Sequence, residues 1–288
     1  MDKTTYFYPN LTMRAGGRIV DFHSPLIMGI LNVTPDSFYD GGAFRDVSDA
    51  LTHAMHMVDA GADIIDIGGM SSRPGATLIS PAEELSRVIP VITAIRSALP
   101  DILLSIDTIH SEVADQAIQA GAHIINDISA GAFDPKLIGV AAHHQVPYIL
   151  MHMQGKPENM QANPAYSDIT AEIMDFFIQK VHQIREQGVT DIILDPGFGF
   201  GKDLNHNYTL LRDWDQLMSI GLPMLAGVSR KSMVCRLLGV KPEQALNGST
   251  ALHALLLQKG AHILRVHDVR EAAEVRSIVR AAQSDKVF

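Results

Sequence analysis

The chain has 288 residues, 47% of them hydrophobic and 19% charged, which suits one large domain with a sizeable core. A formal net charge of −9 argues against broad binding of nucleic acids, which needs a basic face, although a local basic pocket can still hold a small anion. A single cysteine, Cys235, excludes an internal disulfide and a zinc site built on cysteines.

The N-terminus shows no basic region followed by an apolar segment, the pattern of a secretory signal. No apolar run approaches the ~18 residues of a membrane span. We therefore expect a cytoplasmic protein with no membrane partner. Residues 1–25 precede the first apolar run, and we expect them to form a hairpin-like extension that closes the bottom of the domain.

Eight short runs rich in Ile, Val and Leu recur along the chain, and each has the apolar character on both faces that a buried parallel strand requires. Three of them are preceded by the same pattern, in which a glycine ends a helix and the strand starts within two residues. It occurs in DAGADII, QAGAHII and QKGAHIL. The runs occupy residues 26–33, 62–69, 101–108, 122–129, 147–153, 191–197, 223–230 and 261–268.

Apolar residues at helical spacing fill the intervals between these runs. Ser80 as N-cap, Pro81 at the first helical position and Glu83 at the third predict a capping box at one helix start. The patterns are plain in residues 45–58, 80–100, 167–188, 249–260 and 268–282.

Eight alternating strand and helix units predict an α/β fold, a (β/α)8 TIM barrel that spans residues 1–288 as a single domain. An open, doubly wound sheet is the alternative, but eight units over this length favour a closed barrel.

Every predicted strand ends in polar or special residues after an apolar body. Active sites of such barrels lie at the carboxyl ends of the strands, so these residues should converge on one mouth. In chain order they are Asn32; Asp66, Gly68 and Gly69; Asp107; Asn126 and Asp127; Met151 and His152; Asp195; Ser229, Arg230 and Lys231; and Arg265, His267 and Asp268.

One group of strand ends suits a flat heterocycle with an amidine-like edge. Asp107, Asn126 and Asp195 offer hydrogen-bond acceptors for paired N–H donors, and Lys231 offers donors to a ring oxygen or nitrogen. A lysine such as Lys231, taken alone, is more often a solvated surface residue, but its position among these strand ends favours a role in the site. A Schiff-base aldolase that uses Lys231 is a rival interpretation from this chemistry alone.

A second group suits a phosphate-type anion. Arg265 and His267 are typical anion ligands, and they follow the last strand, which neighbours the first strand and its Asn32 in a closed barrel. An asparagine oxygen can also hold a hard cation such as Mg²⁺. Of the remaining carboxylates, Asp66 suits either a ligand contact or an ion pair with an arginine, and Asp127 is expected to be structural.

The segment DPGFGFGK, residues 195–202, is rich in glycine and ends in lysine, as phosphate-binding loops often do. It lacks the first glycine of a Walker loop and the Ser or Thr after the lysine, and it fails the dinucleotide pattern too. We expect Asp195 to be the residue of this segment that contacts the ligand. The rings of Phe198 and Phe200 should pack against a ligand ring, and Lys202 should lie at the periphery of the site.

The ordered set of strand-end motifs resembles the dihydropteroate synthase family over nearly the whole chain. One tetrapeptide is weak evidence, whereas the set, each member at its strand end, is specific. Members of the family often carry an acidic residue and a threonine where Met70 and Ser72 stand here. The matching stretches are ILNVTPDSFYDGG, DIGGMSSRPGA, SIDT, INDI, LMHMQG with PENMQ and PAY beyond it, DPGFGFGK, GVSRK and RVHD.

The resemblance implies a transferase of folate biosynthesis that condenses 6-hydroxymethyl-7,8-dihydropterin pyrophosphate with p-aminobenzoate. The products would be 7,8-dihydropteroate and pyrophosphate. It also implies inhibition by sulfonamides at the p-aminobenzoate site and a homodimer formed through outer helices.

The resemblance further implies roles for individual residues. The pterin site would comprise Asp107, Asn126, Met151, Asp195, Phe200, Lys231 and Arg265. The p-aminobenzoate site would comprise Phe38, Ser72, Arg73, Pro74, Ser229 and Lys231. Pyrophosphate would bind to Asn32, Arg73, Arg265 and His267, with Mg²⁺ at Asn32, and the catalytic groups would be Asp107, Lys231, Arg265 and His267.

Two alternatives share these pterin groups. One is a methyltetrahydrofolate-dependent methyltransferase, which would not need the PDSF and SSRPGA loops or the Arg265 and His267 pair. The other is a pterin-binding paralogue without turnover, towards which Met70 is the one hint.

Overall fold

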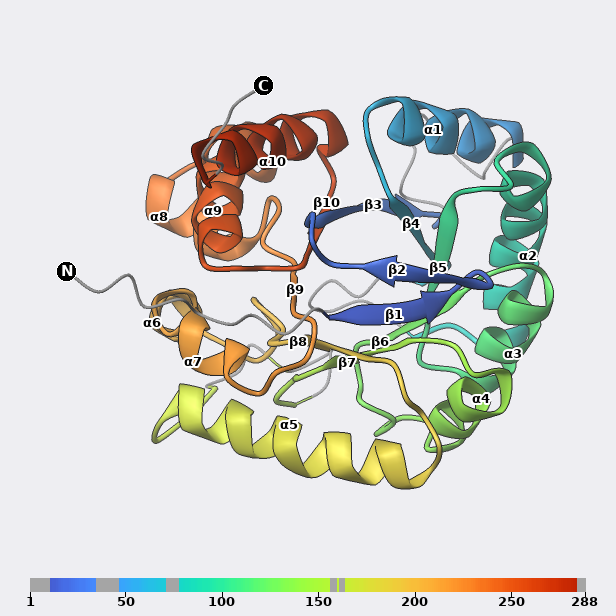
Figure 1. Cartoon of the computed structure of the whole chain (residues 1–288), viewed down its shortest axis with the longest axis horizontal. Helices are drawn as coiled ribbons and strands as arrows, with labels where there is room; N and C mark the ends of the chain where they lie inside the picture. The colour runs from blue at the N-terminus through green and yellow to red at the C-terminus, as the bar shows by residue number, and fades with distance from the viewer. Residues whose placement is uncertain (1–10, 35–46, 71–77, 156–159, 161–163, 284–288) are drawn as a thin grey trace.

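The computed structural model describes residues 11–34, 47–70, 78–155, 160 and 164–283. Its central sheet has eight parallel strands in the order β8-β7-β6-β5-β4-β3-β10-β9, and a parallel bridge between Leu194 and Met224 joins the two edges. The predicted (β/α)8 barrel is thus confirmed (Figure 1). The strands are β3 Leu26–Asn32, β4 Ile64–Gly68, β5 Leu103–Asp107, β6 Ile124–Asp127, β7 Tyr148–Met151, β8 Ile192–Asp195, β9 Leu225–Ala226 and β10 Ile263–Val266.

Helices surround the barrel (Figure 1). Ser80 caps α2 as predicted, since its hydroxyl accepts from Glu83 N at 3.2 Å, but the Glu83 carboxylate accepts from Arg87 instead of returning to the cap. No helix within the described ranges is long and apolar enough to cross a bilayer. The helices are α1 Val47–Asp59, α2 Pro81–Ala98, α3 Ser111–Gln119, α4 Lys136–His144, α5 Ile169–Glu186, α6 Leu204–Arg212, α7 Trp214–Met218, α8 Ser232–Leu238, the 3-10 turn Pro242–Gln244, α9 Leu246–Gln258 and α10 Val269–Gln283.

Successive side chains of each strand face opposite sides of the sheet, so some face the surrounding helices and the others face the barrel interior. Outward residues such as Ile65, Leu104 and Leu150 pack with the helices in the larger apolar core. The inward residues near the strand starts form a second apolar layer. Two residues further along, several inward positions become polar, and this change places the functional groups in the upper half of the barrel. The lower layer is Met28, Ile64, Leu103, Ile124, Ile149, Ile193, Leu225 and Ile263, and the polar positions above it are Asp66, Ser105, Asn126, Asp195 and Arg265.

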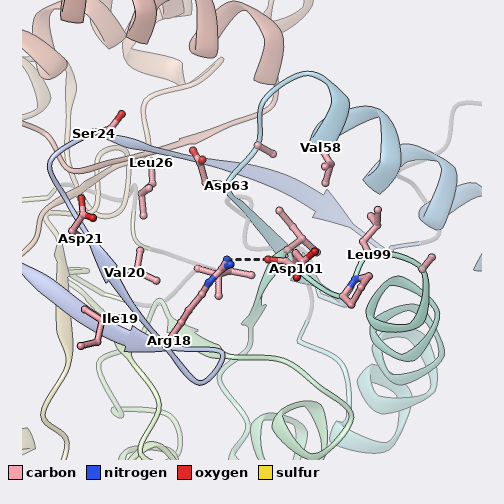
Figure 2. Close-up of a pocket in the computed structure, with 15 residues that line it drawn as sticks. Arg18, Ile19, Val20, Asp21, Ser24, Leu26, Val58, Asp63, Leu99 and Asp101 are labelled. Atoms are coloured by element: carbon pink, nitrogen blue, oxygen red, sulfur yellow. Dashed lines mark hydrogen bonds between the residues drawn. The ribbon is translucent and has the colours of Figure 1, made fainter.

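A short antiparallel hairpin closes the bottom of the barrel, in the segment for which the sequence suggested one. Strand β1, Thr12–Ala15, pairs with β2, Arg18–Asp21, and Met13 packs on the lower apolar layer. Beside the hairpin lies a cleft of about 780 Å³, where Arg18 donates to the carbonyl of Asp101 at 2.9 Å (Figure 2). This cleft is at the amino ends of the strands, so it is separate from the mouth described below.

The segments that follow the three helix-ending glycines also connect the starts of neighbouring strands by hydrogen bonds. The residue two positions after each glycine accepts the backbone N–H of the adjacent strand through its side chain. Burial lowers the pKa of His123 and of His262 to about 4, so both imidazoles are neutral and able to accept at neutral pH. The pairs are Asp63 with Ile27 at 2.8 Å, His123 with Leu104 at 3.0 Å and His262 with Met224 at 3.0 Å.

Candidate active site

Strand register sets a row of residues across the mouth of the barrel. Asn32, Gly68 and Asp107 are paired across β3, β4 and β5, and Asp107 is paired with Asn126 on β6. A side-chain carbon added at Gly68 would meet Asn32 Oδ1 and Asp107 Cβ, each at 3.6 Å. The glycine therefore keeps open the space between Asn32 and Asp107.

Arg265, on β10, reaches the carboxylates of β4 and β5. Its Nε donates to Asp66 Oδ2 at 2.6 Å, and its Nη2 donates to Asp107 Oδ2 at 2.6 Å. Asn126 donates to the same Asp66 oxygen at 3.0 Å. Asp66 is fully buried, so it needs this counter-ion. Of the two interpretations of Asp66, the ion pair with an arginine is the one that the structure contains.

Burial sets the protonation of this network. It raises the pKa of Asp107 to about 7, although Arg265 acts in the opposite direction. Burial also disfavours the charge of Arg265, but Asp66 and Asp107 outweigh it and raise the pKa of the guanidinium. Arg265 therefore stays cationic, while Asp107 can take up or release a proton near neutral pH and can meet either a donor or an acceptor on a ring.

Lys231 and Asp195 form the other side of the mouth. Lys231 Nζ donates to the carbonyl of Phe198 at 2.5 Å and lies 4.8 Å from the centroid of the Phe200 ring. Burial lowers the pKa of Lys231 to about 8, with Asp195 opposing this shift. Burial raises the pKa of Asp195, with Lys231 opposing it. The two groups therefore stabilise each other's charged forms across the site.

The DPGFGFGK segment is a tight loop pressed against the chain that follows β7. Gly197 and Gly201 have φ values of 69° and 61°, which residues with a side chain rarely adopt. A side-chain carbon would collide with the carbonyl of His152 at Gly197 and with that of Gln154 at Gly201. The glycines therefore serve close backbone packing, and Asp195 Oδ1 accepts from Gly197 N at 2.7 Å to fix the start of the loop.

The two phenylalanines of this loop point to different environments. Phe200 belongs to a small apolar cluster at the mouth with Met70 and Met151, which agrees with a slot lined by Met151 and Phe200. Phe198 was expected to wall the site too, and this expectation is wrong. Its ring is fully buried and stacks on Trp214, with the centroids 6.1 Å apart.

Lys202 is not peripheral, which corrects the expectation from the sequence. It is only 2% exposed, and its Nζ lies 3.1 Å from His152 Nδ1, 3.2 Å from the His152 carbonyl oxygen and 2.9 Å from that of Phe200. Burial lowers the pKa of Lys202 to about 7, with Asp195 opposing the shift. The local pattern carries no signal for this, because His152 is 50 residues away in the chain.

His267 and Ser229 join the ends of β10 and β9. The Ser229 hydroxyl oxygen lies 3.2 Å from both the backbone nitrogen and Nδ1 of His267. The neighbouring Arg230 forms an ion pair with Asp268 at 2.6 Å, which ties the same two loops. His267 follows the end of β10, the strand that pairs with β3, and Asn32 is the last residue of β3.

Asp127 faces outward and is structural, as predicted. Its carboxylate accepts from Ser129 N and Oγ, each at 2.7 Å, from Gly131 N at 2.6 Å and from the Tyr148 hydroxyl at 2.5 Å. Asn126, one residue earlier, faces inward. The alternation of strand side chains separates the two roles.

Tyr148→Phe is expected to lower the free energy of unfolding by about 1–3 kcal/mol, because it removes a hydrogen bond to a buried carboxylate that keeps its other donors. The catalytic efficiency kcat/KM should not change, since Tyr148 lies in the core between barrel and helices. Urea unfolding measures the first quantity. Tyr208→Phe, which removes a 3.4 Å bond to the Met233 carbonyl, is the control with the smaller expected loss. Equal losses in the two variants would contradict the role given to Asp127.

Four of the predicted p-aminobenzoate residues, Phe38, Ser72, Arg73 and Pro74, lie outside the described residues. In the part of the chain that the structure describes, no group of three or more His, Cys, Asp or Glu side chains could hold a metal ion. A cation at Asn32 would therefore take most of its ligands from a bound anion and from water, which is the usual habit of Mg²⁺ at phosphate sites.

Known proteins resemble this chain over almost all its length. A family profile described as Pterin binding enzyme matches residues 28–267. Dihydropteroate synthase from Escherichia coli (strain K12) is 47% identical over 274 residues, 94% of this chain and 96% of that protein. The Yersinia pestis dihydropteroate synthase, solved with a sulfonamide drug complex, has 46% identity and a TM-score of 0.90 over 95% of this chain and 99% of its own. The Xanthomonas albilineans enzyme, solved with 4-aminobenzoic acid, has 40% identity and a TM-score of 0.90 over 96% of this chain and 100% of its own.

Proposed function

This chain belongs to the pterin-binding enzyme family, among the dihydropteroate synthases, and from that premise we propose which of its residues carry the reaction. The enzyme condenses 6-hydroxymethyl-7,8-dihydropterin pyrophosphate with p-aminobenzoate and releases pyrophosphate. The methyltransferase and aldolase interpretations give way to this one, because relatives that match 94% of the chain are synthases. The observation that supports the roles below is the convergence of Asp107, Asn126, Asp195, Lys231 and Arg265 at the mouth of the barrel.

The pterin is held by the inward polar groups. Asp107, Asn126 and Asp195 form hydrogen bonds with the N–H groups and ring nitrogens along one edge of the pterin, and Lys231 donates to a ring oxygen or nitrogen. Met151 and Phe200 lie in one apolar cluster and cover the flat faces of the ring. Because Asp107 has its pKa raised to about 7, it can adjust its proton to the ring atom that it meets.

The chemical step replaces one bond at the methylene group attached to the pterin. The nitrogen of p-aminobenzoate forms a bond to this carbon, the carbon–oxygen bond to pyrophosphate breaks, and the nitrogen releases a proton. The arylamine is already a neutral nucleophile, so the site needs no strong base. Catalysis consists of positioning the two substrates and stabilising charge on the departing oxygens.

Arg265, His267 and Asn32 bind the departing pyrophosphate. Arg265 uses Nε and Nη2 on Asp66 and Asp107, and its Nη1 makes no hydrogen bond within the described residues, so it can face the anion. We assign Mg²⁺ to the oxygen of Asn32 together with phosphate oxygens and water, where it would neutralise charge on the leaving group. The donor set fits a substrate-bound magnesium ion, since Asn32 offers one amide oxygen and no group of three or more His, Cys, Asp or Glu side chains among the described residues could hold a metal by itself.

The second substrate lies between the strand-end loops. Ser229 and Lys231 are at the mouth. We assign Phe38, Ser72, Arg73 and Pro74 to the same site on the family resemblance alone, and Arg73 to pyrophosphate as well. The related enzymes solved with 4-aminobenzoic acid and with a sulfonamide support binding of the same two classes of molecule here. Sulfonamides should therefore compete with p-aminobenzoate.

Pyrophosphate release is the experiment that tests the function. The purified protein is given dihydropterin pyrophosphate and Mg²⁺, with and without p-aminobenzoate, and dihydropteroate is followed in parallel. We expect release that depends on p-aminobenzoate, appears in step with dihydropteroate and stops when EDTA removes the metal. Release without the amine would show that the second-substrate loops do not work. No release from folded protein that still binds the pterin would point to the paralogue without turnover.

The enzyme is also proposed to be a homodimer that pairs through α8, α9 and α10. Four of the seven large apolar side chains that are exposed in the described residues lie on these helices, which contact one another. They are Leu237, Leu238, Leu255 and Ile278. Exposed apolar side chains gathered on neighbouring helices are a common mark of an interface. Light scattering that gives twice the 31.4 kDa chain mass would support this, and a loss of the dimer in Leu255→Glu would locate it.

A cytoplasmic location completes the proposal. It rests on the single cysteine, Cys235, which leaves the chain without a disulfide, as is usual for proteins of reducing compartments. Cell fractionation with an antibody against the chain tests it.

A further inference from the structure

The ammonium group of Lys202 is held inside the protein by three acceptors from two segments. The Phe200 carbonyl belongs to the loop after β8, and the His152 carbonyl and imidazole belong to the end of β7. A lysine ammonium has three N–H donors, so this arrangement satisfies all of them. Since His152 Nδ1 must accept, the imidazole is neutral there, in agreement with a pKa lowered to about 3 by burial and by the charge of Lys202.

The two segments that Lys202 joins both carry parts of the pterin site. The loop after β8 holds the Phe200 ring beside Lys231, and its Phe198 carbonyl accepts from the same lysine. The other segment is joined to the strand end as well, since His152 N donates to the carbonyl of Asp195 at 3.0 Å. Lys202 therefore sits behind the loop, at the point where the loop meets β7 and β8.

A buried lysine that only filled space would be an unfavourable choice. An isolated buried charge lowers stability, and an apolar residue of the same length would pack there without that penalty. Asp195 is the carboxylate whose charge favours the ionised form of Lys202, and Lys231 opposes it. The charge of Lys202 is therefore coupled to the two groups that face the ring from this side of the mouth, although Lys202 itself is 2% exposed and does not reach the cavity.

We propose that Lys202 is a positioning residue of the pterin site, which holds the loop at residues 197–200 against the end of β7 so that Phe200 and Lys231 face the pterin ring. The inference rests on the proposed function, because it assigns the loop to the pterin. It predicts that removal of the ammonium weakens pterin binding while leaving the p-aminobenzoate site and the fold in place.

The chain provides its own reporter of the loop. Trp214 is the only tryptophan, it is fully buried, and it stacks on Phe198 of the same loop with an interplanar angle of 13°. Its fluorescence therefore responds to displacement of the loop without any turnover. This separates a failure of the inference from a failure of the proposed function, which the activity of the unchanged enzyme decides.

The test compares Lys202→Met with Lys180→Met. Lys180 is a matched control on α5, because its Nζ makes one 3.4 Å contact to the Ala130 carbonyl, away from the loop. In Lys202→Met we expect the KM for dihydropterin pyrophosphate to rise roughly tenfold or more, as loss of hydrogen bonds to a site loop implies, with less than a threefold change for p-aminobenzoate. The Trp214 emission should shift in this variant and not in the control.

Lys202→Gln is the second variant, because its amide can still donate to a carbonyl without a charge. We expect an intermediate KM for the pterin substrate and a smaller change in Trp214 emission. A folded Lys202→Met protein with unchanged pterin KM and unchanged emission would overturn the inference. So would equal losses for both substrates, or failure of both variants to fold, since either result would assign Lys202 to general stability.

Discussion

Replacing Arg265 by methionine should lower the free energy of unfolding by about 3–5 kcal/mol at pH 8, because it leaves two carboxylates in the barrel without their counter-ion. Asp66 is fully buried and the side chain of Asp107 is 12% exposed, so water replaces little of the lost interaction. The rate should fall by about 10²–10³-fold as well, since the guanidinium also stabilises charge on the leaving group in the proposed mechanism.

The loss of stability in Arg265→Met should depend on pH in a defined direction. The pKa of Asp107 is already raised to about 7, and Arg265 holds it down, so removing the arginine raises it further. A carboxyl group with a raised pKa stabilises the fold at low pH and loses that contribution as pH rises through its folded value. The variant should therefore lie closer to the unchanged enzyme at pH 5 than at pH 8.

Urea unfolding at the two pH values, together with steady-state kinetics, checks this prediction. Arg212→Met is the control, because Arg212 pairs with Asp213 at the surface and its side chain is 70% exposed. Exposed ion pairs contribute little to stability, so no comparable loss is expected there. A similar loss in the two variants, or a loss that does not change with pH, would contradict the role of Arg265 as the buried counter-ion.

Lys231→Met should lower kcat/KM by about 10²–10³-fold with a smaller effect on folding. The ammonium lies at the mouth, above the Phe200 ring, and it supports the charged form of Asp195. Without it, the pKa of Asp195 should rise further, and the pterin loses both a donor and an ionised acceptor. The expected decrease is therefore larger than the loss of one hydrogen bond.

The pH profile gives a second readout for Lys231. Its pKa is lowered to about 8 by burial, so the charged form is present below that value and is lost above it. In the unchanged enzyme kcat/KM should therefore fall as pH rises through about 8, and this limb should be missing in Lys231→Met. Lys136→Met, at an exposed position on α4, is the control and should keep both the rate and the limb. An unchanged alkaline limb in Lys231→Met would assign it to another group.

Much of the fold could be predicted because its signals are local. Each buried parallel strand needs a short apolar run, and glycine after a helix marks the turn into the next strand, so all eight strands lie inside the runs that the sequence shows. The closed barrel then places the strand ends at one mouth. This placement predicts that Asp107, Asn126, Asp195, Lys231 and Arg265 lie at the same mouth. The alternation of side chains could also separate Asn126 from Asp127, since neighbouring residues of a strand face opposite sides.

Three expectations about side-chain contacts are wrong, because each contact depends on a neighbour that the local pattern does not specify. Glu83 was expected to close a capping box with Ser80, but Arg87 on the next turn takes its carboxylate. Phe198 was expected at the ring, but the loop turns it towards Trp214 in the core. Lys202 was expected to lie at the periphery of the site, but it is buried and its ammonium group contacts His152. In each case the residue type is compatible with both the expected and the observed position, and the side chain or backbone group that it contacts in the folded protein determines which one occurs.

Periodicity and turn residues act over a few positions, so the order of strands and helices, the closed barrel and the set of side chains at its mouth can be predicted from the amino-acid sequence alone. Which of those side chains pair with one another depends on the folded arrangement of the whole chain. Asp66 and Arg265 are 199 residues apart, and Lys202 and His152 are 50 apart. Their partnership depends on register and loop path, which bring buried charges within reach of the few groups that can offset the loss of water.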